Sequence, residues 1–217
     1  MVGIVGTVGS GKSTLVKLLT KLYPVEREKI FVNGIDINDI SSRNIRELIA
    51  FVPQESFLFS DQVRKNIAFA QEEIDQEKVV HYAQLASVHN EIEKFPHGYE
   101  TVVGERGVTL SGGQKQRVTI ARALYTQRDV LIFDDCLSAV DPETEERIIN
   151  ALRKNYREKT MIVITHRLKV LKDADIIVVL DEGEIVEKGY HEQLMDLDGM
   201  YARMFKKQMI QEELEYE

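Results

Sequence analysis

The 217-residue chain has no tryptophan, one cysteine and four prolines. The single cysteine, Cys136, cannot form a disulfide within the chain, which favours a reducing compartment. The longest apolar runs, at 130–133, 161–164 and 176–180, are far shorter than the ~20 residues that a membrane-spanning helix needs. Residues 1–5 are too few and not basic enough for a signal peptide, so we expect none. This composition is that of a soluble protein of the cytosol.

Positive charge is also in deficit. The chain has 28 Lys and Arg against 36 Asp and Glu, a formal net charge of −8. A broad nucleic-acid footprint needs clustered basic residues to neutralise phosphates, so we predict no nucleic-acid partner.

Short apolar runs alternate with longer helical patterns, which is typical of an α/β fold whose sheet is mainly parallel. We predict strands at residues 1–5, 130–133, 160–165, 175–180 and 184–187.

Helical patterns dominate the segment between the first two of these strands. We predict helices at 63–69, 75–86 and 89–94, in a helical subdomain spanning 61–103. Residues 1–60 and 104–217 then form the sheet-bearing core. A last helix, at 200–214, carries an apolar stripe of Met200, Tyr201, Met204 and Phe205. Such a stripe could face a cofactor or a partner, but packing is the commoner role.

Residues 6–13, Gly-Thr-Val-Gly-Ser-Gly-Lys-Ser, match the phosphate-loop pattern G-x-x-x-x-G-K-[ST] between a predicted strand and a predicted helix. Glycines let the backbone approach phosphates, and the following helix presents N–H groups to them. Lys12 would reach the β- and γ-phosphates, and the Ser13 hydroxyl would ligate Mg²⁺. The residues predicted to bind nucleotide here are Gly6, Thr7, Val8, Gly9, Ser10, Gly11, Lys12, Ser13 and Thr14.

Residues 110–114, Leu-Ser-Gly-Gly-Gln, open a helix predicted to run to about Tyr125. Ser111 and Gln114 have the spacing of a capping box. Two glycines in a first helical turn cost about 1 kcal/mol each relative to alanine, which indicates that something approaches this backbone closely. A helix start without bulky side chains also suits an anion.

The phosphate loop, the Leu-Ser-Gly-Gly-Gln segment and an apolar strand ending in Asp134 follow one another in the order found in ATP-binding cassette (ABC) ATPases. The chain resembles this family over nearly its whole length, and the five-residue segment is the family's signature. The resemblance implies a P-loop NTPase core with an inserted helical subdomain, and ATP and Mg²⁺ as ligands. It also implies a head-to-tail dimer in which each signature contacts the γ-phosphate held by the other domain. The residues acting across that dimer would be Ser111, Gly112, Gly113, Gln114 and Asp141.

The resemblance assigns roles to further residues. Asp134 matches the Walker B aspartate, which holds Mg²⁺ through water, and Ser13 and Gln54 would be the other metal ligands. Gln54 also matches the Q-loop glutamine, which contacts the attacking water, and His166 matches the switch histidine at the γ-phosphate. Asp141 ends a D-loop-like segment at 138–141, and it can also cap a helix that begins at the proline after it.

Two segments resemble the exporter branch of the family. Residues 104–107, Gly-Glu-Arg-Gly, match a loop that exporters carry before the signature. Residues 57–60, Phe-Leu-Phe-Ser, resemble the surface that receives the coupling helices of a transmembrane domain.

Position 135 departs from the family, which has a glutamate there to polarise the attacking water. Asp135 is one methylene shorter, which withdraws the carboxylate by about 1.3 Å. A misplacement near 1 Å can cost about 10²-fold in rate. We predict a degenerate, slow site, as in exporters with two unlike halves, so a heterodimer is favoured and a homodimer remains possible. The alternative is that Asp135 itself works as the base.

Family members also carry an antiparallel sheet before the phosphate loop, with an aromatic residue that stacks on adenine. Only five residues precede Gly6, and none is aromatic. We therefore expect a fragment of a longer polypeptide whose N-terminal β-subdomain is largely missing. Loss of the stacking partner would weaken nucleotide binding by about 1–3 kcal/mol.

The sequence thus predicts the ATPase domain of an ABC exporter, at the cytoplasmic face of a membrane, with Asp135, His166 and Gln54 as catalytic residues and low activity when isolated. The main alternative is a regulatory module that binds ATP and dimerises but does not hydrolyse. A chromosome-maintenance ATPase is disfavoured because no sustained heptads separate the phosphate loop from the signature. A translation factor of the family would normally carry two cassettes.

Overall fold

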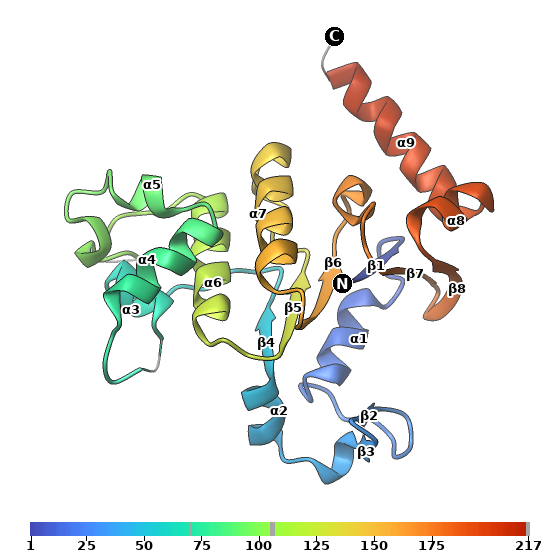
Figure 1. Cartoon of the computed structure of the whole chain (residues 1–217), viewed down its shortest axis with the longest axis horizontal. Helices are drawn as coiled ribbons and strands as arrows, with labels where there is room; N and C mark the ends of the chain where they lie inside the picture. Colours follow the sequence, from blue (N-terminus) through green and yellow to red (C-terminus); the bar gives the residue numbers. More distant parts are fainter. Residues whose placement is uncertain (70, 105–106, 216–217) are drawn as a thin grey trace. The chain divides into compact units, whose positions relative to one another are not determined.

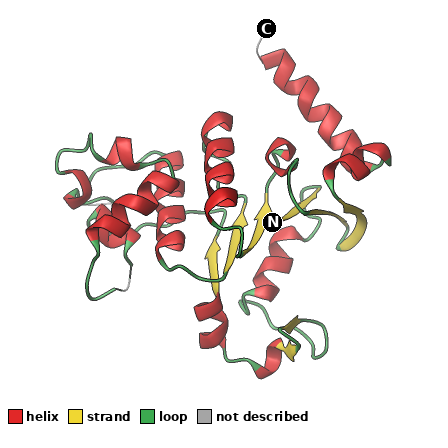
Figure 2. Cartoon of the chain, viewed as in Figure 1, coloured by secondary structure: helices red, strands yellow, loops and turns green. Residues whose placement is uncertain are grey.

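A computed structural model describes residues 1–69, 71–104 and 107–215 of the chain (Figure 1). It has two compact units, one formed by Met1–Ile49 and Thr160–Glu217 and the other by Ala50–Lys159. Each unit contains both strands and helices, so the predicted α/β class is confirmed (Figure 2). None of the helices in the described ranges has both the length and the apolar character to cross a membrane.

The first unit is built on a sheet whose central strand is β1 (Val2–Gly6). β1 pairs in parallel with β6 (Thr160–Ile164) on one side and with β7 (Ile176–Asp181) on the other. β8 (Glu184–Gly189) adds an antiparallel edge to β7. Because β1 is covered on both faces, its residues are apolar or small at successive positions rather than alternately. The predicted strands and the mainly parallel sheet are therefore confirmed.

The helices of this unit are α1 (Lys12–Leu19), α2 (Ser42–Leu48), α8 (His191–Asp196) and α9 (Met200–Glu215), with short 3₁₀ turns η1 (Ile37–Asp39) and η3 (Leu168–Leu171). On α9, Tyr201 and Phe205 are buried, so the stripe on this helix packs as the commoner interpretation predicted.

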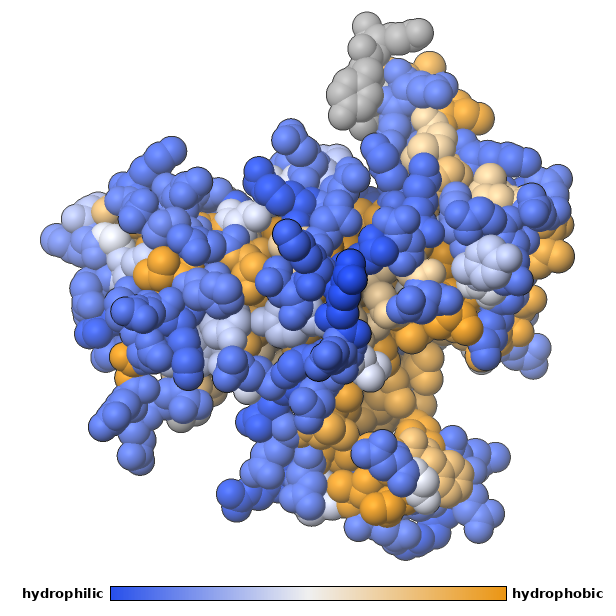
Figure 3. All heavy atoms as spheres, in the orientation of Figure 1, coloured by the Kyte–Doolittle hydropathy of each residue, from blue (hydrophilic) through white to orange (hydrophobic). Residues whose placement is uncertain are grey.

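A small antiparallel pair, β2 (Phe31–Val32) and β3 (Ile35–Asp36), was not predicted, because strands of two residues carry no periodicity. Figure 3 shows an apolar patch over this hairpin, where Phe31 and Ile35 are 55% and 54% exposed.

The second unit holds two neighbouring strands, β4 (Ile49–Val52) and β5 (Val130–Asp134). Its helical elements are α3 (Val63–Ile67), α4 (Gln76–Leu85), α5 (His89–Ile92), η2 (Gly98–Glu100), α6 (Gly112–Tyr125) and α7 (Pro142–Asn155). The helices expected at 63–69, 75–86, 89–94 and 111–125 are all present, and α6 packs against α3 and α4. The proposed subdomain 61–103 falls inside this unit.

Candidate functional site

The phosphate-loop residues connect β1 to α1 in the first unit. Gly6 is buried with a φ of +151°, and a Cβ there would lie 2.0 Å from the carbonyl oxygen of Leu180. Only glycine fits at this position. Gly11, with a φ of +97°, directly precedes α1, so no side chain caps the start of that helix. The loop is therefore a tight backbone turn followed directly by a helix N-terminus, an arrangement that binds phosphates.

The loop is organised around the ammonium group of Lys12, whose residue is only 7% exposed. Its Nζ donates to the carbonyl oxygens of Gly6 (3.0 Å) and Thr7 (2.7 Å) and to Ser10 Oγ (3.3 Å). The Thr7 hydroxyl donates in turn to Asp181 Oδ1 over 3.0 Å. A positive charge is thus held inside the turn.

The first unit also contains the other predicted loop residues and His166. Val8 is at the exposed tip of the loop, and Ser13 and Thr14 belong to the first turn of α1. His166 is exposed and follows β6.

The signature residues begin α6 in the second unit. Ser111 Oγ accepts the Gln114 N–H (3.2 Å), and Gln114 Oε1 accepts the Ser111 N–H (2.9 Å), so the predicted capping box is confirmed. A Cβ on Gly113 would lie 2.8 Å from the carbonyl oxygen of Ala139. The backbone of the D-loop-like segment therefore lies close to the backbone of the first turn of α6, within the same unit.

That segment is held by two side chains. The side-chain amide of Gln116, on α6, accepts the Ala139 N–H (3.0 Å) and donates to Ser138 Oγ (3.3 Å). Asp141 Oδ1 accepts the Thr144 N–H over 2.8 Å, which confirms the predicted cap of α7 and lowers the pKa of Asp141.

Glu91, on α5, joins the signature in a network that the sequence did not reveal. Its carboxylate accepts Gln114 Nε2 (2.8 Å) and Arg117 Nη1 (2.6 Å), while Arg117 Nε donates to the Gly113 carbonyl oxygen (3.1 Å). Partial burial acts to raise the pKa of Glu91, but the hydrogen bonds from Arg117 and Gln114 outweigh it, and the pKa is lowered. No local pattern marks a contact between residues this far apart in the chain.

The Glu91→Gln variant is expected to lose about 1–2 kcal/mol of stability at pH 7, because Arg117 and Gln114 lose their anionic acceptor. A lowered folded-state pKa gives stability that is present above the unfolded pKa and lost as the pH falls through the folded one. The difference from wild type should therefore shrink below about pH 4. Urea unfolding at pH 7 and at pH 3.5 measures it. Glu77→Gln, an exposed change on α4, is the control, and an equal loss in both variants would contradict the role of Glu91.

The end of β5 brings two predicted catalytic residues together. Asp134, the last residue of the strand, is buried, and Asp135 follows it with a φ of +45°. The Nε2 of Gln54 lies 3.3 Å from Asp135 Oδ2. An exposed amide and a carboxylate at hydrogen-bond distance can hold a water molecule between them and a phosphate.

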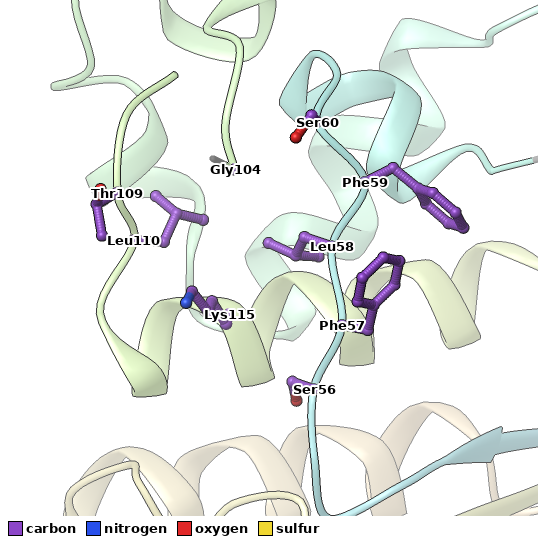
Figure 4. A pocket seen from close by; sticks show the side chains of 9 residues that line it. All are labelled: Ser56, Phe57, Leu58, Phe59, Ser60, Gly104, Thr109, Leu110 and Lys115. Carbon is purple, nitrogen blue, oxygen red and sulfur yellow. The ribbon is translucent and has the colours of Figure 1, made fainter. Parts of the chain in front are cut away.

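The segment predicted to receive coupling helices is a partly apolar surface. Phe57 and Phe59 are 63% and 40% exposed, with their rings edge to face 5.0 Å apart. Arg122, on α6, lies over the Phe59 ring and donates to the Phe57 carbonyl oxygen over 2.9 Å. Figure 4 shows these rings pointing away from Leu58, which faces Leu110 and Lys115 across the pocket. The full lining is Ser56, Phe57, Leu58, Phe59, Ser60, Gly104, Thr109, Leu110 and Lys115. Of the predicted exporter loop, Glu105 and Arg106 lie outside the described residues.

Comparison with known proteins agrees with these features. A family model described as ABC transporter matches residues 1–138. The chain is 44% identical over 207 residues to an ATP-dependent lipid A-core flippase of Saccharophagus degradans, covering 95% of this chain and 35% of that protein. It is 43% identical over 215 residues to the multidrug resistance-like ATP-binding protein MdlA of Escherichia coli, covering 99% and 36%.

A solved structure of a bacterial Atm1-family ABC exporter with ATP bound superimposes with a TM-score of 0.91 at 41% identity, covering 96% of this chain and 37% of that one. The chain thus spans about a third of the length of the relatives it matches.

Proposed function

Since the chain belongs to the ABC transporter family, we propose that it is the ATP-binding and ATP-hydrolysing domain of an exporter. The observation that carries this proposal is the phosphate loop closed around Lys12, with the buried ammonium bonded to three loop oxygens. The identities above 40% to a flippase and to an Atm1-family exporter support the exporter branch. Such a domain works at the cytoplasmic face of a membrane.

ATP would bind with its phosphates on the loop of residues 6–14. Ser13, Gln54 and Asp134 would hold Mg²⁺, since hydroxyl, amide and carboxylate oxygens are the donors this ion prefers. When bound, the ion neutralises charge on the β- and γ-phosphates. Asp135 accepts the proton of the attacking water, Gln54 orients that water, and His166 contacts the γ-phosphate.

The dimer would be head to tail, with Ser111, Gly112, Gly113, Gln114 and Asp141 acting on nucleotide held by the other domain. A heterodimer is favoured because Asp135 makes this chain's own site slow, while its intact signature completes the site of a partner. The surface at Phe57 and Phe59 would receive the coupling helices of a transmembrane domain. In this arrangement 61–103 is the helical subdomain and the rest of the chain is the core.

The Gly112→Asp variant tests the action of the signature across a dimer. A carboxylate there would face the γ-phosphate of a second chain, so ATP-dependent self-association should be lost while ATP affinity of the monomer changes less than about twofold. Light scattering with Mg²⁺-ATP and nucleotide titration measure the two quantities. Gln76→Asp, which adds the same charge at an exposed position in the first turn of α4, is the matched control.

Dimers of Gly112→Asp as stable as wild type would contradict the proposal. If the wild-type chain stays monomeric with saturating ATP, the result contradicts a homodimer but not a heterodimer with a second kind of chain.

A further inference from the structure

The Gln208 side chain, on the C-terminal helix, is hydrogen-bonded to the loop that carries His166. His166 lies between the end of β6 and the start of η3. Gln208, on α9, donates through Nε2 to the His166 carbonyl oxygen (2.9 Å) and accepts the Leu168 N–H at Oε1 (2.7 Å). The carbonyl needs a donor and the N–H needs an acceptor, so these two partners fix the orientation of the carboxamide.

These hydrogen bonds give partners to two backbone groups of the loop. The first N–H groups of a helix have no partner within it, and Leu168 is the first residue of η3. The preceding N–H, of Arg167, is accepted by Thr165 Oγ1 over 3.0 Å. Side chains therefore hold the backbone on both sides of Arg167, and Gln208 reaches it from outside the loop.

The helix that presents Gln208 is itself anchored to this unit. The Glu187 carboxylate, on β8, accepts the Tyr201 N–H over 2.9 Å at the start of α9. The Tyr201 hydroxyl lies 2.8 Å from His191 Nδ1, and the Phe205 side chain is buried one turn further along. Gln208 thus projects from a helix whose first two turns are fixed by contacts with β8 and α8.

We propose that Gln208 is a positioning residue for His166, so that docking of α9 sets the direction of the histidine toward the terminal phosphate of ATP. This inference rests on the proposed function, in which His166 contacts the γ-phosphate. ADP has no γ-phosphate. A displaced His166 therefore weakens the binding of ATP and leaves the binding of ADP unchanged.

The Gln208→Ala variant tests the inference, with Gln211→Ala as the matched control at an exposed position of the same helix. Titration with Mg²⁺-ATP and Mg²⁺-ADP gives the ratio of the two affinities. We expect Gln208→Ala to lower the preference for ATP by about 3- to 10-fold, part of the 10- to 100-fold that one hydrogen bond to a charged group is worth. Amide hydrogen exchange at Leu168 should accelerate in Gln208→Ala and stay unchanged in Gln211→Ala.

The His166→Ala variant and the double variant separate two kinds of failure. If Gln208 acts through the histidine, His166→Ala lowers the ATP preference and adding Gln208→Ala lowers it no further. An unchanged ratio in Gln208→Ala beside a lowered ratio in His166→Ala overturns the inference and leaves the proposed function intact. An unchanged ratio in His166→Ala overturns the proposed role of the histidine, and the inference with it.

Discussion

Replacing Lys12 with alanine is expected to lower the affinity for Mg²⁺-ATP by more than about 100-fold. The ammonium group already sits inside the phosphate loop, bonded to the carbonyl oxygens of Gly6 and Thr7 and to Ser10 Oγ. Phosphate oxygens offer it stronger, charged acceptors. Two hydrogen bonds to charged groups, at about 1.5–3 kcal/mol each, correspond to a factor above 100. Isothermal titration with ATP measures the loss.

The position of the ammonium group, and not only its charge, produces this effect. Lys12→Arg keeps the charge but places a planar, larger group in a turn that is almost fully buried, so we expect affinity close to that of the alanine variant. Lys17→Ala removes a charge from the same helix, where Nζ lies 5.4 Å from the centre of the Tyr23 ring. That control should change affinity less than about threefold. Less than a fivefold loss in Lys12→Ala would contradict ATP binding at this loop.

Four of the strands were predictable because they are buried on both faces. Such strands appear in the sequence as continuous apolar runs, and β1, β5, β6 and β7 all do so. β2, β3 and β4 have two to four residues, and nothing in so short a segment distinguishes a strand from a loop. The short helix α2 lies between β3 and β4 and was missed for the same reason.

Within the candidate site, local interactions were predictable and distant ones were not. The capping box of Ser111 and the cap formed by Asp141 involve residues three apart, so spacing alone identifies them. The partners of Glu91, Gln116 and Gln208 lie 22 to 42 residues away. Only the fold brings them together. Gln116 and Gln208 bond to the backbone of segments that the motifs had identified, and Glu91 bonds to the side chains of Gln114 and Arg117. The motifs thus identify the residues proposed to bind nucleotide. The side chains that hold those residues in place lie outside the motifs.

The Asp135→Glu variant is expected to raise ATP turnover at least tenfold at saturating Mg²⁺-ATP, with little change in the concentration for half-maximal rate. The added methylene moves the carboxylate about 1.3 Å further from the backbone, and a shift near 1 Å is worth up to about 10²-fold in rate. Gln54 Nε2 lies 3.3 Å from the present Asp135 carboxylate, so the amide that would orient the water is already in place. Asp135→Asn keeps the shape but removes the base, and should show no turnover above background.

The backbone conformation at this position is expected to make the glutamate variant less stable. Asp135 has a φ of +45°, in the left-handed region that aspartate enters more readily than glutamate. We therefore expect Asp135→Glu to be less stable than wild type by about 0.5–1 kcal/mol, measured by urea unfolding. Faster turnover together with lower stability means that Asp135 makes an otherwise intact site slow, which favours a heterodimer with a partner that carries glutamate. Equal and substantial rates in both chains would instead mean that Asp135 is a working base, and would favour a homodimeric exporter. A restored glutamate that gives no turnover, even beside a competent partner, would favour the regulatory module that binds ATP without hydrolysing it.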